Sequence, residues 1–201
     1  MNFNESQTRK NLAKSFAAEC QAGARYEFMA TQAQNEELFY VKDTMKAIAK
    51  NEMAHAKLFY DYIVKYSKQE DMVEFDADFP YVSPKLDESL KSESLIEKSE
   101  FEKIYPLFAS VAREEGYTDI AESFLLVAKI ENSHSKILEH LNKLYKNGAM
   151  YESKSKKVLR CTNCGHLGYG SGAWKTCPVC SLGQGYIMID YATIFEECAK
   201  D

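Results

Sequence analysis

Glutamate and histidine residues recur in pairs, three positions apart, in three separate stretches of the chain. The pairs are Glu52 with His55, Glu97 with Glu100, and Glu131 with His134. On a helix, two residues at this spacing lie on one face, so both side chains of a pair can reach a common centre. Together with Glu19 they provide five carboxylates and two imidazoles. This mostly oxygen donor set suits two iron or manganese ions better than zinc or calcium.

Four cysteines form a second metal-binding pattern near the C-terminus. They make two C-x-x-C pairs separated by twelve residues: Cys161, Cys164, Cys177 and Cys180. Two such pairs can deliver four thiolates to one tetrahedral ion. A structural zinc ribbon and a one-iron electron-transfer site use the same ligands, so the pattern alone leaves both interpretations open.

The elements that must position the first set are four amphipathic helices. Apolar residues recur at alternating intervals of four and three over 8–35, 37–67 and 118–146, and less regularly over 86–115. The ionisable residues interrupt the apolar face near the middle of each segment. A single Glu-x-x-His pair is common on helix surfaces. Here all four apolar faces carry ionisable residues near their middle, which indicates that these residues meet at one level inside the core. Several buried carboxylates this close together need cations between them.

Local signals mark the boundaries of these elements. Pro106 is expected to kink the third helix, Thr118 to be the N-cap of the fourth, and Gly148 to end it. Residues 70–84 lack a helical period and are long enough for a crossover along a bundle. We therefore predict a mainly α-helical chain with a four-helix bundle over 1–147, a basic linker over 148–157 and a small four-cysteine β module over 158–201.

Composition excludes several classes of protein. The 201 residues include 30 acidic and 25 basic side chains, a net charge of −5 that argues against a nucleic-acid or anionic-membrane surface. No stretch approaches the roughly 20 apolar residues of a membrane span, and no secretory leader is visible. We therefore expect a cytoplasmic protein, without nucleic-acid or membrane partners, whose paired cysteines bind metal.

The order of the two patterns, bundle first and cysteines last, resembles the rubrerythrin family. The resemblance extends from about residue 8 to 191, and six segments carry it: E-C-Q-A-G-A-R-Y from Glu19, E-M-A-H from Glu52, I-Y-P-L-F-A from Ile104, A-R-E-E-G-Y from Ala112, C-T-N-C-G from Cys161 and C-P-V-C from Cys177. It implies a ferritin-like four-helix bundle with one long crossover and a rubredoxin-like β module. It also implies iron in both, as a di-iron site and as one ion on four cysteines, with zinc or manganese able to substitute.

The resemblance further implies roles for single residues. Glu52 and Glu131 would bridge the two irons, Glu19 would be a terminal ligand of one, and Glu97 with His134 would be terminal ligands of the other. Glu100 and His55 would exchange at the first iron, carboxylate when oxidised and imidazole when reduced, which makes them the catalytic candidates. Tyr26 and Tyr105 either hydrogen-bond to ligand carboxylates or are plain core aromatics.

The function implied by the resemblance is reduction of hydrogen peroxide to water in oxidative-stress defence. Electrons would come from reduced rubredoxin or an NAD(P)H-linked reductase through the four-cysteine iron. The family also implies a homodimer with electron transfer between subunits. Two alternatives stay open: a ferroxidase that handles iron as ferritins do, and a binding module with a structural zinc ribbon and no turnover.

Overall fold

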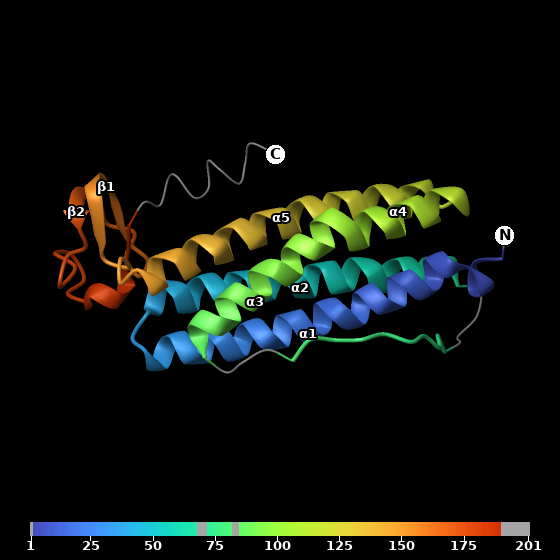
Figure 1. The fold of residues 1–201 in the computed structure, drawn as a ribbon, viewed down its shortest axis with the longest axis horizontal. Helices are drawn as coiled ribbons and strands as arrows, with labels where there is room; N and C mark the ends of the chain where they lie inside the picture. Colours follow the sequence, from blue (N-terminus) through green and yellow to red (C-terminus); the bar gives the residue numbers. More distant parts are fainter. Residues whose placement is uncertain (1, 68–71, 82–84, 190–201) are drawn as a thin grey trace.

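The computed structural model describes residues 2–67, 72–81 and 85–189, and its helices form a four-helix bundle (Figure 1). After the short 3-10 turn η1 (Phe3–Glu5), the helices are α1 (Gln7–Asn35), α2 (Phe39–Tyr66), α3 (Leu86–Ser99), α4 (Tyr105–Glu114) and α5 (Thr118–Lys146). A π-helical turn, η2 (Glu100–Ile104), joins α3 to α4, so these three make one leg of the bundle. The predicted fold class, a helical bundle followed by a small β module, is confirmed. None of the described helices is long and apolar enough to cross a membrane.

Local sequence explains where the helices begin and end. The Ser6 hydroxyl accepts a hydrogen bond from the backbone N–H of Arg9 (3.1 Å) and caps α1. At the other end of the bundle, Gly148 has φ +60° directly beyond α5, as expected for a helix stop. The prediction for Thr118 was wrong by one position. Tyr117 is the N-cap, without a side-chain capping bond, and Thr118 is the first residue of α5.

The third helix of the prediction is interrupted by η2 just before Pro106. The backbone N–H of Tyr105 donates to the carbonyl of Glu100, five residues earlier, instead of four as in an α-helix. Pro106 has no N–H to donate, so the helix loses a bond at this point and accommodates one extra residue. The predicted disturbance at Pro106 therefore takes the form of a π-turn.

Two apolar clusters fill the bundle, one on each side of the ionisable residues. The cluster nearer the C-terminal module includes Tyr26, Met45, Ile48, Leu90 and Leu138. The other cluster is richer in aromatic rings and includes Leu12, Phe59, Tyr105, Phe124 and Val127. On each leg, the predicted metal ligands lie between these two groups in sequence, so they form a polar layer across the middle of the bundle.

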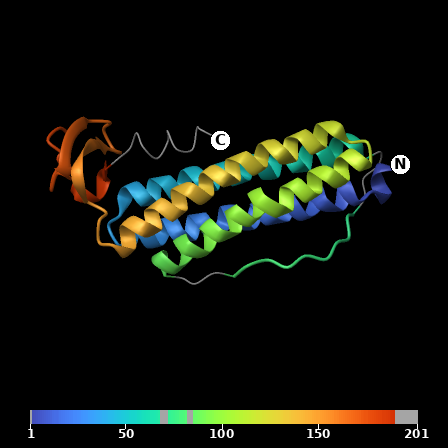
Figure 2. The same cartoon turned by 45° about the horizontal axis from the view of Figure 1, so that its top comes forward.

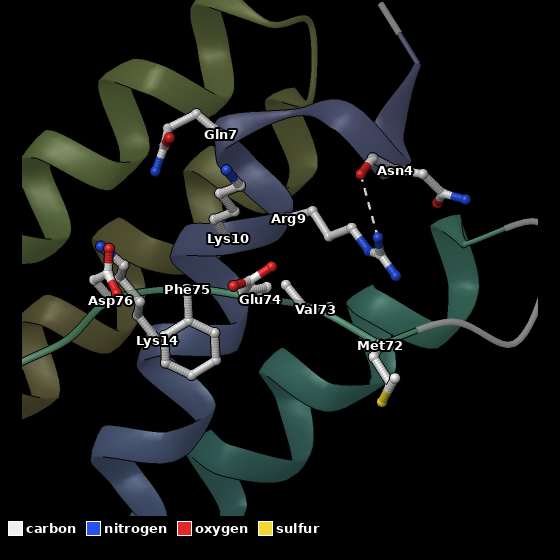
Figure 3. Close-up of a pocket in the computed structure, with 10 residues that line it drawn as sticks. All are labelled: Asn4, Gln7, Arg9, Lys10, Lys14, Met72, Val73, Glu74, Phe75 and Asp76. Atoms are coloured by element: carbon white, nitrogen blue, oxygen red, sulfur yellow. Dashed lines mark hydrogen bonds between the residues drawn. The ribbon is translucent and has the colours of Figure 1, made fainter.

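The connection from α2 to α3 is described over residues 72–81, which run in extended form beside α1 (Figures 1 and 2). The predicted crossover covered 70–84, of which 70–71 and 82–84 lie outside the described residues. Figure 3 shows Met72–Asp76 facing the first turns of α1 across a cavity of about 550 Å³. Lys10, Lys14 and Glu74 give this cavity a polar lining.

The C-terminal module is a three-stranded antiparallel sheet in the order β2-β1-β3. Its strands are β1 (Glu152–Cys161), β2 (Leu167–Gly172) and β3 (Ile187–Ile189), with a 3-10 turn, η3 (Gln184–Tyr186), before β3. Residues 152–157, which the sequence suggested as linker, belong to β1. Of these residues Glu152 and Lys157 pair with β2, with a register shift between them, and the side chains of Glu152, Lys154 and Lys156 are exposed. The domain boundaries themselves stay a prediction, and residues 190–201 lie outside the described part.

The module lies against the end of its own bundle. The ring of Tyr186 stacks on Phe39 of α2 at 4.4 Å between centroids. Gly185 sits so close to the start of α2 that a Cβ atom there would lie 1.9 Å from the Glu37 carbonyl oxygen. A side chain at position 185 would prevent this approach of the module to the bundle.

Candidate metal centres

Two glutamates hold the middle of the polar layer, and each contacts both histidines. The Nδ1 atom of His55 lies 3.0 Å from Glu131 Oε1 and 3.3 Å from Glu52 Oε2. The Nδ1 atom of His134 lies 2.9 Å from Glu131 Oε2 and 3.0 Å from Glu52 Oε1. Each carboxylate thus presents one oxygen to each histidine, the arrangement of a bridging ligand between two ions.

The ligand atoms separate into two overlapping sets. One set contains Glu19, Glu52, His55 and Glu131, and the other contains Glu52, Glu97, Glu131 and His134. Within each set one ligand atom per residue lies within 4.8 Å of all the others, and every member is buried. Because Glu52 and Glu131 belong to both sets, the residues could hold two adjacent ions.

Tyrosines from neighbouring helices hold the two terminal glutamates. The Tyr105 hydroxyl donates to Glu19, and the Tyr26 hydroxyl donates to Glu97. Both tyrosines are completely buried. Of the two roles that the sequence left open for them, the structure therefore shows the contact with site carboxylates, in addition to packing in the core.

Several buried atoms of the cluster have no hydrogen-bond partner, which tests whether metal ions fit. They are Glu52 Oε1, His55 Nδ1, Glu97 Oε2, both carboxylate oxygens of Glu131, and His134 Nδ1. Buried polar atoms are rarely left unsatisfied, because each costs free energy. These atoms are the same ones that face each other in the two sets, so two cations with preference for oxygen and imidazole would satisfy them.

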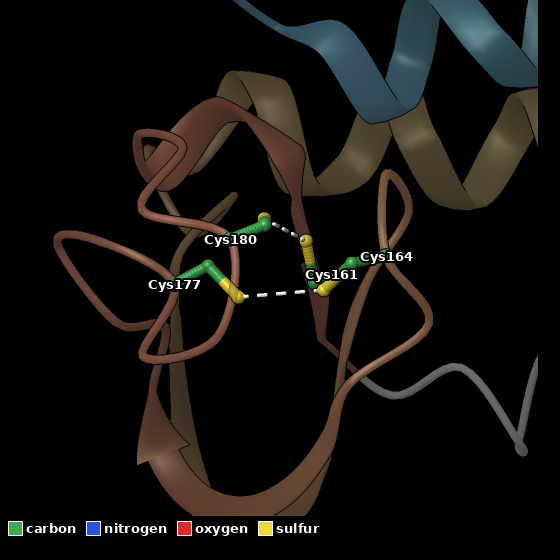
Figure 4. Close-up of side chains that lie close together, drawn as sticks. All are labelled: Cys161, Cys164, Cys177 and Cys180. Atoms are coloured by element: carbon green, nitrogen blue, oxygen red, sulfur yellow. Dashed lines mark hydrogen bonds between the residues drawn. The ribbon is translucent and has the colours of Figure 1, made fainter.

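The four cysteines also meet, at the loops beside β1 and β3 (Figure 4). The Sγ atoms of Cys161 and Cys180 lie 3.7 Å apart, as do those of Cys164 and Cys177. A tetrahedron with metal–sulfur bonds of about 2.3 Å has edges of about 3.8 Å, so the spacing fits one ion and excludes disulfides. The backbone N–H of Leu182 lowers the pKa of Cys180, whereas burial raises that of Cys161, so the thiols share their protons unevenly until a cation binds.

Comparison with known proteins identifies the family. The sequence model of the family described as Rubrerythrin matches residues 10–142 and 99–160. The rubrerythrin of Clostridium perfringens is 34% identical over 185 residues, which is 92% of this chain and 94% of the relative. The rubrerythrin of Nitratidesulfovibrio vulgaris is 32% identical over 185 residues, with the same coverage. The chain belongs to the rubrerythrin family.

Solved structures agree on the fold of this rubrerythrin-family chain. Nigerythrin in a mixed-valence state aligns with a TM-score of 0.60 at 22% identity, over 94% of this chain and 93% of that one. A bacterioferritin from Desulfovibrio desulfuricans aligns with a TM-score of 0.59 at 22% identity, over 71% of this chain and 82% of that one. As a member of the rubrerythrin family, the chain has a di-iron carboxylate site in its bundle and a four-cysteine site in its C-terminal module.

Electrostatics show why the rubrerythrin cluster needs cations. Burial raises the pKa of Glu97 to about 8 and that of Glu19 well above its usual range. Burial would lower the pKa of His55, but contacts with Glu131, Glu19 and Glu52 raise it to about 12. Without cations, the cluster therefore holds extra protons, on the imidazoles and on buried carboxyl groups such as Glu19. Two metal ions would replace these protons.

Glu100 stands apart from the other predicted ligands. It is half-buried in η2 and belongs to neither ligand set among the described residues. Burial, and then the charge of Glu97, raises its pKa well above the usual range, which favours a neutral carboxylic acid. Glu100 also lines a cavity of about 750 Å³ between η2, α1 and the crossover. Its ligand role therefore stays a prediction, and the structure adds an access route to it.

The sequence reasoning missed Asn51. The Nδ2 atom of this side chain lies 3.2 Å from Nε2 of His134, the ring nitrogen that faces away from the cluster. When Nδ1 of His134 binds a metal ion, Nε2 carries the proton, so the Asn51 amide must turn its oxygen Oδ1 to this position and accept from Nε2–H. That hydrogen bond would fix the orientation and tautomer of the histidine ligand. Asn51 lies on an exposed part of α2, beside Glu52 in sequence, so apolar periodicity gave no signal for it.

Proposed function

We propose that this chain is a non-haem di-iron peroxidase that reduces hydrogen peroxide to two waters in oxidative-stress defence. The observation that carries the proposal is the pair of overlapping ligand sets with Glu100 set back beside a cavity. Bound iron would supply one electron from each of two ions, so that the O–O bond is cleaved in one two-electron step. The family is generally one of oxidoreductases, and the reducing cytoplasm is the proposed location.

The residues of the chain would handle protons and ligand exchange. Glu100, neutral because of its burial, would give a proton to the leaving oxygen at the cavity wall. Detachment of Glu100 would leave a ligand position for His55, whose Nδ1 already lies 3.5 Å from Glu19 Oε2. Glu52 and Glu131 would keep both ions in place while this exchange occurs.

Electrons would enter through iron on the four cysteines, from reduced rubredoxin or an NAD(P)H-linked reductase. The module contacts α2 at Phe39 and at Asp43, whose carboxylate lies 3.4 Å from the Thr162 hydroxyl. These residues precede Glu52 by thirteen and nine positions, or about 20 and 14 Å along the helix axis. Because the module lies beyond them, we propose a homodimer in which the four-cysteine iron of one copy serves the di-iron site of the other.

The test is stopped-flow oxidation of the anaerobic, diferrous protein. One equivalent of hydrogen peroxide should oxidise the bundle irons much faster than air-saturated buffer does, and Glu100→Gln should slow the peroxide reaction roughly 100-fold. Glu102→Gln is the matched control, because Glu102 is exposed in the same π-turn. Faster oxidation by oxygen, with uptake of iron far beyond about three ions per chain, would favour a ferroxidase. Zinc alone on the cysteines would favour a structural ribbon.

A further inference from the structure

The cavity beside Glu100 is much larger than hydrogen peroxide requires. Its volume of about 750 Å³ is within the range of pockets that hold small organic ligands. Hydrogen peroxide needs roughly twice the 30 Å³ of one water. The walls come from α1, the end of α3, η2, α4 and the crossover. Most of the lining is apolar: Ala18, Phe79, Ile96, Ile104, Leu107 and Phe108.

The polar members of the lining are Lys14, Asp76 and Asp78, from α1 and the crossover, together with Ser15, Ser99, Glu100 and Tyr105. Besides Glu100, the cavity wall includes Ser15, which is 2% exposed and whose hydroxyl oxygen has no hydrogen-bond partner. Ser15 precedes Glu19 by four positions on α1, so the two side chains point along one face of that helix. A buried hydroxyl without a partner is costly, and an oxygen-bearing ligand in the cavity would satisfy it.

The cavity of about 550 Å³ under the crossover differs from this one in its lining. It also lies between α1 and the crossover and shares Lys14 and Asp76 with the first cavity, but Lys10 and Glu74 line it as well and no predicted metal ligand does (Figure 3). The two cavities therefore share charged residues, and the apolar residues Ile96, Ile104, Leu107 and Phe108 line only the cavity that reaches Glu100.

We propose that the cavity beside Glu100 binds the organic group of an alkyl or aryl hydroperoxide, so that the chain reduces organic hydroperoxides as well as hydrogen peroxide. The inference rests on the proposed peroxidase function. The O–O bond of ROOH would be cleaved with two electrons from the two ferrous ions, which become ferric, and with two protons, one from Glu100 and one from solvent, which also returns the proton to Glu100. The products are one alcohol ROH and one water. The apolar walls would hold R while the hydroperoxide group lies near Ser15 and Glu100.

Kinetic comparison of two peroxides tests the activity. For the iron-loaded, full-length protein we expect cumene hydroperoxide to be reduced with kcat/KM at least equal to that for hydrogen peroxide, since each buried methylene is worth roughly fourfold. Leu107→Lys, which puts a charge at the cavity mouth, should lower the ratio of the two kcat/KM values at least tenfold. Leu126→Lys is the matched control, because Leu126 is 63% exposed and Leu107 is 61% exposed, and Leu126 lies on α5 outside the cavity. It should change the ratio less than twofold.

A binding measurement gives a readout without turnover. The product alcohol, 2-phenyl-2-propanol, should bind saturably to the oxidised protein in ligand-observed NMR, and Leu107→Lys should weaken that binding at least fivefold. Reduction of hydrogen peroxide without reduction of cumene hydroperoxide, or without saturable alcohol binding, would overturn the inference and leave the proposed function standing. Failure to reduce either peroxide would overturn both.

Discussion

The two halves of the di-iron site are built alike from different helices, and they differ in how firmly they are held. The His55 half contains Glu19, His55 and Tyr105, and the His134 half contains Glu97, His134 and Tyr26. In each half, a tyrosine from one helix pair donates to the terminal carboxylate of the other pair. Helix α1 supplies Glu19 and Tyr26, and the leg of α3 and α4 supplies Glu97 and Tyr105. Each leg therefore donates a tyrosine hydrogen bond to the glutamate of the other.

One difference is a single residue. Tyr26 follows Glu19 by seven positions, or two helical turns, whereas Tyr105 follows Glu97 by eight. The π-turn η2 absorbs the additional residue, so that Tyr105 still reaches Glu19. Glu100 begins this turn. The irregularity thus supplies the His55 half with an extra carboxylate, and π-turns of this kind are frequent at functional sites.

The second difference lies behind the histidines. Asn51, the residue before Glu52, contacts His134 Nε2 from α2. The corresponding residue before Glu131 is Ile130, which is apolar, and among the described residues His55 Nε2 has no hydrogen-bond partner. The His134 half is also braced by the Arg25–Glu93 ion pair (2.7 Å) beside Tyr26. The comparison indicates that the His134 half is fixed. Within the part of the chain that the structure describes, the His55 half has an imidazole without a partner at Nε2, the additional carboxylate of Glu100 and the adjoining cavity, which are the features that ligand exchange needs.

The largest effect should come from the residues that both halves share. Glu131→Gln cannot bridge two cations with a neutral amide, so we expect both bundle ions to be lost and total iron to fall from about three to about one per chain. Glu19→Gln touches only the His55 half and should leave about two. Metal analysis after anaerobic reconstitution measures both, and the four-cysteine ion is the internal standard. Equal losses in the two variants would contradict the bridging assignment.

Deleting one residue should distinguish the π-turn from the regular helix. Without Lys103, η2 can become α-helical and the spacing from Glu97 to Tyr105 would match that from Glu19 to Tyr26. We expect the melting temperature to change by only a few degrees, with loss of most peroxide reduction because Glu100 is displaced. Deletion of Ala24, which is exposed in the regular helix α1 between Glu19 and Tyr26, is the control. No π-turn absorbs this deletion, so it rotates one part of α1 by about 100° relative to the other and should cost more than about 4 kcal/mol of unfolding free energy. Similar melting temperatures for the two deletions would refute the extra-residue interpretation.

The hydrogen-bond partner of His134, Asn51, can be removed by substitution, and a similar partner can be introduced beside His55. Asn51→Leu should weaken metal binding in the His134 half by roughly 10- to 100-fold, the usual effect of losing such a contact. Ile130→Asn should do the reverse for His55, strengthening binding in its half and slowing ligand exchange. Titration of the apoprotein with Co²⁺, whose absorption reports imidazole ligands, measures both. Unchanged Co²⁺ affinity in Asn51→Leu would show that the 3.2 Å contact has no positioning role.

Sequence alone could predict the fold and the gathering of glutamates and histidines at one level of the bundle, because both rest on spacing. The assignment of Glu52 and Glu131 as shared residues came from the family resemblance. Glu52 and His55 interrupt a regular apolar period, and that period also defines the helix that carries them. Asn51 could not be predicted, since its position is exposed and its contact depends on how α2 packs against α5. The π-turn had a signal, the unequal spacings from Glu19 to Tyr26 and from Glu97 to Tyr105, but only the pairing of tyrosines with carboxylates gives it meaning. Residues 152–157 were predicted to be a linker because they are polar and charged. They form part of β1 instead, since a stretch of strand that pairs on one side only can keep charged side chains in solvent.

The smallest effect concerns the end of the bundle beyond the His55 half, where Glu115 joins the two helix pairs. Its carboxylate accepts hydrogen bonds from the N–H groups of Gln7 (2.9 Å) and Thr8 (2.8 Å) and from the Thr8 hydroxyl (2.6 Å), and so caps α1. Burial would raise the pKa of Glu115, but these bonds lower it below the usual value. The stabilisation is therefore present above the unfolded-state pKa of about 4.3 and is lost as pH falls through the lower folded-state pKa.

Glu115→Gln should lower the free energy of unfolding by about 1 kcal/mol at pH 7, and the difference from the unmodified chain should shrink below about pH 4. Glu114→Gln is the control, because Glu114 only accepts from Ser110 within α4 (3.1 Å) and should change stability little at either pH. Urea unfolding at the two pH values measures the effect. Iron content should not change, because a cap at the helix end contacts neither half of the site. A loss of iron confined to the His55 half would instead mean that its tolerance for exchange depends on how firmly this end of the bundle is closed.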